Sequence, residues 1–339
     1  MLPVWWASSD DRILCPDDDG VRRWLDTMRK DFPLAANPAD CVDQSFVGAP
    51  WGWSVAAARR LHSAGATVPS PDTLRHIRML SHRRTSIRII ESLRQLLPFA
   101  IPPTPVEAFS MAEIEQAARH VSGGIHVKSP WSSSGRGVMP HLPDDTRQRK
   151  WLESTLRRQG SVMCENSLDC ASDFAMLFES NGAMVRFIGY SLFHVSRGCA
   201  YGGNLLVSDS EIERRLEAAG ANISHLHAIR QTLEQVLPGI LGDSYRGVFG
   251  IDMMLTRDAS ICPCIELNLR RTMGVVALEW RSRWLASGLE ARYTVVPARF
   301  APQCSYTASG GRLTGGCLWL TPPPSNSAEG FAFVVEVNG

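Results

Sequence analysis

Apolar residues recur along the chain with helical and strand periods, and they predict an alternation of helices and strands. Leucines and isoleucines fall largely three or four positions apart in residues 74–97, "LRHIRMLSHRRTSIRIIESLRQLL", which predicts helix. Ser81 interrupts this run and is expected to cap a second helix. A shorter helix that ends near Gly65 is predicted in "SVAAARRLHSAGA". Prolines at positions 98, 102, 103 and 105 then end the helical region and mark a linker.

The pattern after this linker again switches between the two periods. Ser110, three positions before Glu113, predicts a capped helix in "SMAEIEQAARHV". A strand is expected in "GGIHVKSP", a helix in "DDTRQRKWLESTLRRQ" and another strand in "SVMCENSL".

The second half of the chain is richer in expected strands. Two strands, at 173–179 and 183–196, are joined by the tight turn Ser180-Asn181-Gly182. One helix is expected over 209–236, and "HVSRGCAYGGNLL" before it is expected to be a connection. Two more strands, "GVFGIDMML" and "ICPCIELNL", are separated by "TRDAS". The last segment ends in an expected strand to which we assign no chemistry.

These elements predict a chain of the α/β class in three parts. At 339 residues the chain exceeds the size at which one core keeps growing. We expect an N-terminal α/β domain over residues 1–105, a small α+β subdomain over 106–165 and a large α+β subdomain over 166–339. The tryptophans of "APWGWS", residues 49–54, are expected to anchor the N-terminal region to the central one, and a ligand platform is the alternative.

Charge and composition narrow the class of partner. Lys plus Arg (35) nearly equals Asp plus Glu (34), so no overall field favours nucleic acid or an anionic membrane. The start lacks a secretory pattern, no apolar run approaches the length of a membrane span, and a cytoplasmic location is expected. The arginine-rich stretch near residue 80 suits a solvated helix face; the alternative is that Arg83 or Arg84 points at a phosphate.

Nine cysteines are scattered without the CxxC pairs of a structural zinc site, so reduced thiols are expected. Cys262 and Cys264 lie two positions apart, which places both on one face of a strand. Packing in the core is favoured over metal binding for this pair, because free cysteine often behaves as a small hydrophobe.

The segment "VKSPWSSSGRGV", residues 127–138, puts a lysine at the end of a strand and a small polar loop after it. Glycines permit close backbone approach, and amides and hydroxyls bond phosphate oxygens. An ordinary turn is the alternative. The lysine precedes the glycines, so the loop is not the nucleoside-triphosphatase P-loop pattern. The residues in question are Lys128, Ser132, Ser133, Ser134, Gly135, Arg136 and Gly137.

Acidic residues fall on two successive apolar strands. Strand periodicity puts Glu266 and Asn268 on one face, with Arg270 next in line. A hairpin can bring Asp252 level with Glu266, which follows it by 266 − 252 = 14 positions. Carboxylate and amide oxygens suit magnesium. The alternative is a surface acidic pair neutralised by Arg270 and Arg271.

In this order the segments "VKSP...SSSGRGV", "VMCEN" and "GIDMML...IELNLRRTMG" resemble the ATP-grasp superfamily, over roughly residues 75–280. The resemblance implies two α+β subdomains that clasp ATP. It implies that Lys128 contacts the α-phosphate and the adenine edge and that residues 132–137 cover the β- and γ-phosphates. It also implies that Arg270 steadies the phosphoryl group or acyl phosphate. It implies a magnesium site, with manganese as a possible substitute, at Asp252, Glu266 and Asn268. Adenine contacts are implied for Met163, Cys164, Glu165 and Asn166. Where family members commonly carry a second upstream lysine, this chain has Arg83.

The family's chemistry implies a carboxylate-amine ligase that forms an acyl phosphate and releases ADP and phosphate. A regulatory or inactive ATP-binding module and an ATP-dependent small-molecule kinase are the alternatives. Arg197 is suited to bidentate binding of a substrate carboxylate, with an exposed arginine in a turn as the alternative. Arg186 and Asn204 are further substrate candidates. The expected partners are a small carboxylate and an amine, and the family allows a homodimer.

Overall fold

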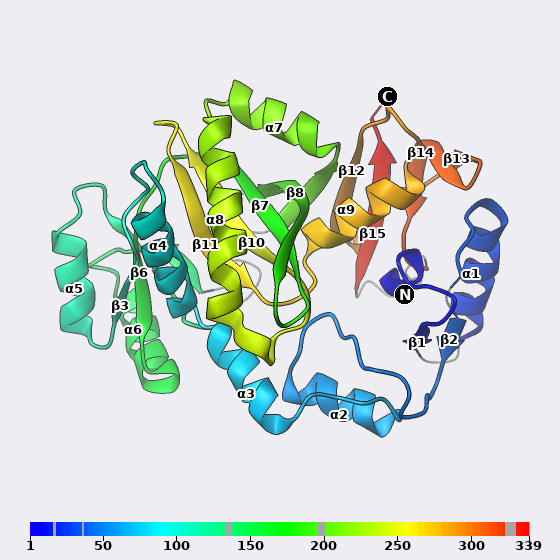
Figure 1. Cartoon of the computed structure of the whole chain (residues 1–339), viewed down its shortest axis with the longest axis horizontal. Coiled ribbons are helices and arrows are strands. Elements are labelled where there is room, and N and C mark those ends of the chain that lie inside the picture. Colours follow the sequence, from blue (N-terminus) through cyan, green and yellow to red (C-terminus); the bar gives the residue numbers. More distant parts are fainter. Residues whose placement is uncertain (16–17, 36, 133–136, 196–200, 323–329, 339) are drawn as a thin grey trace.

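Three β-sheets organise the computed structural model (Figure 1), which describes all residues except 16–17, 36, 133–136, 196–200, 323–329 and 339. A nine-stranded sheet occupies the centre and one side of the molecule. A four-stranded sheet lies at the opposite end, and a short parallel pair lies beside the C-terminal strands. The mixed content confirms the predicted α/β class.

The nine-stranded sheet is antiparallel throughout, and the predicted hairpins form its first half. In spatial order its strands are β11 (Ile261–Asn268), β10 (Gly247–Thr256), β7 (Cys170–Ser180), β8 (Val185–Val195), β9 (Tyr201–Leu206), β12 (Ala291–Pro297), β15 (Phe331–Val337), β14 (Arg312–Trp319) and β13 (Tyr306–Ser309). The turn at Asn181 joins β7 to β8, as its sequence predicts.

One face of this sheet packs against helices and forms the largest core. Alternate residues of β10, among them Phe249, Ile251 and Met253, point into it, as a strand with one buried face requires. Leu93 and Leu233 meet them from two of the covering helices. These helices are α3 (Pro71–Leu80), α4 (Arg84–Leu96), α7 (Asp209–Ala218) and α8 (Ile223–Leu241). Burial of this apolar surface fixes helix α4 beside β11.

A second core joins the two ends of the chain. Trp5 is 1% exposed and contacts Trp24, Phe32, Trp280 and Trp284 edge to face. Its indole N–H donates to the Leu320 carbonyl at 2.7 Å, so the buried polar group is satisfied. The elements gathered here are β1 (Arg12–Leu14), α1 (Asp19–Asp31) and α9 (Met273–Trp284), with the C-terminal strands. Strand β2 (Asn37–Ala39) pairs with β1.

The small sheet has its own core, built around Ile114, Val127 and Leu152. Its strands, in spatial order, are β3 (Val106–Ala108), β6 (Val162–Asn166), β4 (Ile125–Lys128) and β5 (Val138–Pro140), and helices α5 (Met111–Arg119) and α6 (Thr146–Gln159) cover it. The Ser110 hydroxyl accepts from the Glu113 amide and caps α5, as predicted, while the Glu113 carboxylate accepts from the Phe109 amide, one residue before the cap. The boundaries at 105 and 165 stay predictions.

Two helix predictions are wrong in detail. The single helix expected over 209–236 is two helices, α7 and α8, because Gly220 has φ +107° and Asn222 caps α8 by accepting from the His225 amide. Ser81 does not cap a second helix: it ends α3, and its hydroxyl donates to the Ile77 carbonyl at 2.7 Å. Helix α2 (Val55–Ser63) ends where Gly65 predicts.

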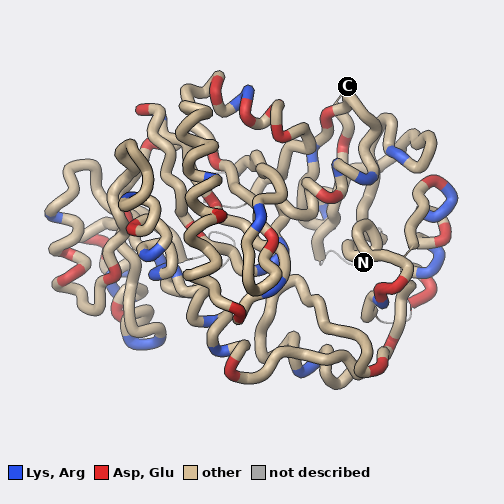
Figure 2. Tube along the Cα trace, in the orientation of Figure 1, with Lys and Arg blue, Asp and Glu red and all other residues tan. Residues whose placement is uncertain are grey.

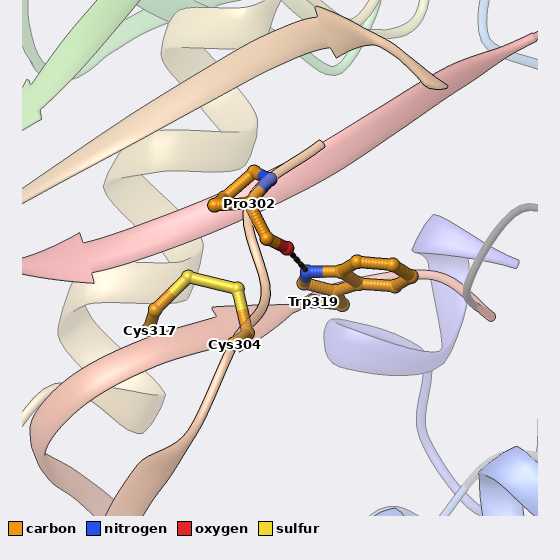
Figure 3. The surroundings of a disulfide bond; sticks show 4 residues. All are labelled: Pro302, Cys304, Cys317 and Trp319. Atoms are coloured by element: carbon orange, nitrogen blue, oxygen red, sulfur yellow. Dashed lines mark hydrogen bonds between the residues drawn. A yellow bond between two sulfur atoms is a disulfide. The ribbon is translucent and has the colours of Figure 1, made fainter. Parts of the chain in front are cut away.

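The expectation of reduced thiols throughout is wrong at one place, because Cys304 and Cys317 form a disulfide (Figure 3). It joins the segment before β13 to β14, beside Trp319, whose indole donates to the Pro302 carbonyl at 3.0 Å. Cys262 and Cys264 are buried in β11, and Cys264 belongs to the large core, as the packing interpretation predicts.

Charged residues of both signs are spread along the chain (Figure 2). Within the described ranges, no helix combines the length and the apolar character needed to cross a membrane.

The tryptophan cluster around Trp5 predicts a large effect of truncation. Trp5→Ala should lower the free energy of unfolding by about 3–5 kcal/mol, because it leaves a cavity where the two ends of the chain meet. Urea unfolding followed by circular dichroism measures this. Val47→Ala, at a site 76% exposed, is the control and should change stability by less than about 0.5 kcal/mol. Equal stability of the two variants would contradict a shared core.

Candidate functional site

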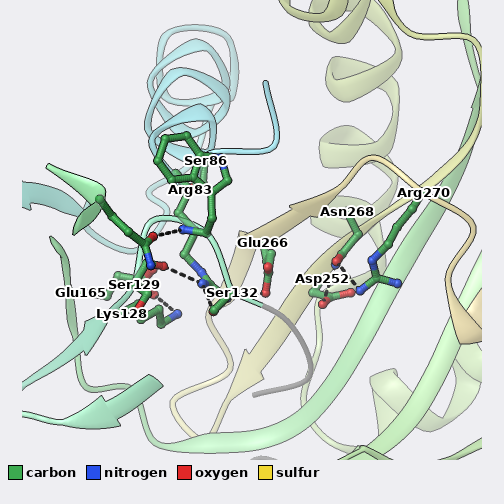
Figure 4. Close-up of polar contacts among 12 residues, drawn as sticks. Arg83, Ser86, Lys128, Ser129, Ser132, Glu165, Asp252, Glu266, Asn268 and Arg270 are labelled. Carbon is green, nitrogen blue, oxygen red and sulfur yellow. Dashed lines mark hydrogen bonds and ion pairs between the residues drawn. The ribbon is translucent and has the colours of Figure 1, made fainter. Parts of the chain in front are cut away.

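Asp252 and Glu266 face each other directly across the β10–β11 hairpin (Figure 4). The register pairs Gly250 with Asn268, Ile251 with Leu267 and Asp252 with Glu266, and an irregularity follows immediately. The sequence prediction that a hairpin brings Asp252 level with Glu266 is therefore confirmed. Like charges on directly opposed residues destabilise a sheet, so this pair needs a positive partner.

Asn268 and Arg270 continue the polar row along β11. The Asn268 amide N–H donates to the Asp252 carboxylate at 2.9 Å, and its carbonyl oxygen accepts from the Arg270 guanidinium at 2.8 Å. Burial raises the pKa of the Asp252 carboxyl to about 7; the facing Glu266 adds to this effect, and Arg270 opposes it. Hydrogen bonds join Asp252, Asn268 and Arg270 into one network, and Glu266 adjoins it by facing Asp252 across the hairpin.

Arg83 reaches this network from the junction between α3 and α4. Its guanidinium donates to Glu266 at 2.7 Å, to the Ser132 hydroxyl at 2.6 Å and to the Ser129 carbonyl at 2.8 Å (Figure 4). The side chain is only 4% exposed. Of the two interpretations of the arginine-rich stretch, Arg83 thus points into the site, whereas the half-exposed Arg84 pairs with Glu107.

The loop after β4 begins beside these groups. The Ser129 amide donates to the Gly137 carbonyl at 2.8 Å, which closes the base of the loop. Gly137 has φ +68°, and a Cβ there would lie 2.7 Å from the Ser129 hydroxyl, so glycine is required. Lys128 is buried at the end of β4 and forms an ion pair with Glu165 on the neighbouring strand. The predicted residues Ser133, Ser134, Gly135 and Arg136 lie outside the described residues.

The adenine prediction at 163–166 falls on β6. Met163 and Cys164 lie where β6 has a partner strand on both sides, since β3 pairs with Val162–Cys164 and β4 continues to Asn166. The open edge of β6 therefore begins at Glu165. A cavity of about 20 Å³ beside Glu165 and Asn166 has room for about one water molecule.

The substrate candidates do not join the network. Arg186 is 72% exposed and pairs with Glu179. Glu179 aligns with Val248 on β10, and Val248 lies four residues, or about 14 Å, along that strand from Asp252. Asn204 lies on β9, a strand where a connection was expected, and it is 2% exposed. Its amide donates to the Ser191 hydroxyl at 2.6 Å and its oxygen accepts from Tyr201, so its polar atoms serve the sheet. Arg197 lies outside the described residues.

Two contacts that the sequence analysis did not assign hold the site in place. The Trp131 indole donates to the Arg78 carbonyl at 3.0 Å and meets the His82 ring edge to face, which ties the loop to the α3–α4 junction. Burial lowers the pKa of His82 to about 4, with Arg84 adding to this effect. The anchor expected at "APWGWS" forms through its tryptophans, since Trp53 packs against the largest core and Trp51 against the second core. The Trp51 carbonyl also accepts from the Arg271 amide at 2.9 Å, just beyond the end of β11.

The donor set fits a hard divalent cation. Two facing carboxylates and an amide oxygen are ligands that magnesium accepts. A bound cation would offset the cost of burying the charged Asp252 carboxylate. Within the described part of the chain, no three His, Cys, Asp or Glu side chains gather as a metal group, so the amide of Asn268 and substrate oxygens would complete the ligand set.

Neither a protein-family model nor a curated protein matches this sequence. Solved structures do match the fold. The Staphylococcus aureus N5-carboxyaminoimidazole synthetase complexed with ADP superposes with a TM-score of 0.54 at 9% identity, over 98% of this chain and 94% of that chain. The biotin carboxylase domain dimer of Hydrogenobacter thermophilus 2-oxoglutarate carboxylase, in complex with MgADP, ADP and bicarbonate, gives 0.51 at 10% identity, over 83% and 66%.

This chain has the ATP-grasp fold. The Aspergillus clavatus N5-carboxyaminoimidazole synthase, in complex with ADP and aminoimidazole ribonucleotide, supports the same assignment, with a TM-score of 0.50 at 12% identity over 96% of this chain and 93% of that chain. The fold named from the sequence motifs is thereby confirmed. All three of these structures hold a nucleotide, and two of them also hold a small molecule, bicarbonate or aminoimidazole ribonucleotide.

The ionisation of Asp252 predicts that the stability of this chain depends on pH. The pKa of this carboxyl is near its ordinary 3.8 in the unfolded chain and about 7 in the folded chain. The free energy of unfolding therefore falls as the pH rises from about 4 to about 7. Asp252→Asn removes the charge and keeps an acceptor for Asn268. With a chelator present, the variant should be more stable than the wild type at about pH 8 by on the order of 4 kcal/mol, which corresponds to about three pKa units at about 1.4 kcal/mol each, and about equal to it near pH 4. Urea unfolding at both pH values tests this, and a less stable variant at pH 8 would contradict it.

Proposed function

We propose that this chain is an ATP- and magnesium-dependent ligase that joins a carboxylate to an amine. The observation that carries the proposal is the polar row on β10 and β11, where Asp252 faces Glu266 and Asn268 bonds to both Asp252 and Arg270. The ATP-grasp fold of nucleotide-bound enzymes supports the choice of ATP.

Each half of the site has a separate task in this proposal. Asp252, Glu266 and Asn268 would hold magnesium, which when bound offsets the charge of the phosphate oxygens. Arg83 and Lys128 are buried cations beside the loop and suit the phosphates. Adenine would bind at the open edge of β6 beyond Cys164. Because the cavity there is about 20 Å³, the small sheet would move away from β11 to admit a purine.

The reaction then needs positioning and charge stabilisation rather than a protein nucleophile. An oxygen of the substrate carboxylate attacks the γ-phosphorus, the bond to the bridging oxygen breaks, and ADP leaves with that electron pair. The amine nitrogen next attacks the acyl carbon, phosphate leaves, and the amine loses a proton. Arg270, held by Asn268, would stabilise the negative charge of the transferred group.

The first test is calorimetric titration of the wild-type protein with a non-hydrolysable ATP analogue, with and without magnesium. We expect binding on the order of micromolar that depends on magnesium, because loop and strands contact the same phosphates. Magnesium-independent binding would favour a regulatory ATP-binding module. No binding in either condition would contradict the proposal.

The second test is turnover. Glu266→Gln should reduce ADP release in a screen of pooled carboxylic acids and amines by at least about 100-fold, with an unchanged circular dichroism spectrum, because the amide keeps the shape but loses the charge that holds magnesium. Glu153→Gln is a matched control, since Glu153 pairs with Arg149 on the surface. Full activity of Glu266→Gln would refute the metal site. A stable phosphorylated product in the wild-type reaction would identify a kinase instead.

A further inference from the structure

Both cations assigned to phosphate are paired with carboxylates in this structure. Arg83 donates to Glu266 at 2.7 Å, and Lys128 pairs with Glu165. Glu266 is also an assigned metal ligand. Arg83, which would hold phosphate, and Glu266, which would hold magnesium, therefore hold each other in this structure.

The surroundings of Arg83 show that this contact is built into the fold. Its guanidinium bonds to the loop through the Ser132 hydroxyl and the Ser129 carbonyl, and its backbone amide donates to the Pro130 carbonyl at 3.1 Å. Among the described residues, the buried Nε of Arg83 has no acceptor. A buried donor without an acceptor costs free energy, and a phosphate oxygen would remove that cost.

The backbone that carries Arg83 is fixed from a second side. Trp131 donates to the Arg78 carbonyl, lies 4.7 Å from the Arg78 guanidinium and packs against His82. These contacts tie the start of the loop to the α3–α4 junction. They place Arg83 between the loop and Glu266, so its side chain can exchange one partner for another.

We propose that Arg83 is a latch: by holding Glu266 on β11, it makes the binding of a divalent cation depend on nucleotide. This inference rests on the proposed function and adds an order of binding to it. A guanidinium 2.7 Å from Glu266 neutralises that carboxylate and repels a second cation. When triphosphate arrives, Arg83 transfers its hydrogen bonds to phosphate oxygens, and Glu266 becomes available to the metal.

The latch predicts a higher affinity for one of the two ligands in each of two variants. Without nucleotide, Arg83→Met should bind Mn²⁺ at least about tenfold more tightly than the wild type, because no guanidinium then offsets the charge of Glu266. Without metal, Glu266→Gln should bind the non-hydrolysable ATP analogue at least about tenfold more tightly, because Arg83 is released. Electron paramagnetic resonance of free Mn²⁺ measures the first gain, and calorimetry in the presence of a chelator measures the second.

Matched variants make these gains specific. Arg84→Met removes a neighbouring arginine that pairs with Glu107, and it should leave Mn²⁺ binding unchanged. The double variant Arg83→Met/Glu266→Gln should lose the gain in Mn²⁺ affinity, because the carboxylate responsible for it is absent. The isosteric Glu266→Gln variant provides an independent measurement if Arg83→Met does not fold.

The outcomes separate the latch from the ligase proposal. Either gain, with no change in Arg84→Met, supports the latch. Wild-type affinity for both probes in folded variants overturns it, while magnesium-dependent nucleotide binding by the wild type still supports the ligase. Failure of every protein to bind nucleotide would count against the ligase, and the Mn²⁺ titration would still decide whether Arg83 shields Glu266.

Discussion

Two carboxylates, Asp252 and Glu266, face each other on neighbouring strands, and the polar groups around them are arranged to offset their charge. Asn268 and Arg270 approach from the end of β11, and Arg83 approaches from the α3–α4 junction. An unshielded acidic pair at this position would destabilise the hairpin. The site and the stability of the sheet therefore depend on the same electrostatic balance.

Segments far apart in sequence meet to maintain that balance. Arg83 and Glu266 are separated by 183 positions, and Trp51 and Arg271 belong to opposite halves of the chain. The core around Trp5 holds the chain's two ends together, and helix α9 connects that core to the end of β11. Packing at one end of the large sheet thus supports side-chain geometry at the other.

Local sequence patterns predicted the parts of the fold that depend on neighbouring residues, such as the register of a hairpin and the start of a helix. Strand alternation and the "TRDAS" turn were sufficient for the register of Asp252 and Glu266, and Ser110 with Glu113 was sufficient for a helix start. The break at Gly220 was missed because apolar periodicity continues across it. Strand β9 was missed because its glycines resemble a connection, although neighbouring strands pair with it. The Cys304–Cys317 bond and the buried position of Arg83 follow from tertiary packing, which no local pattern contains.

Strand β11 is also the outer strand of the large sheet, and this has a consequence for solubility during folding and storage. An exposed outer strand invites pairing with another chain. Here helix α4 packs beside β11, and Gly52 forms an isolated bridge with Arg270 just beyond its end. The opposite outer strand, β13, is only four residues long, and the Cys304–Cys317 bond fixes the segment before it. Helix α4 and the bridge at Gly52, both of which lie beside the candidate site, thus also protect this edge of the sheet from pairing with another chain.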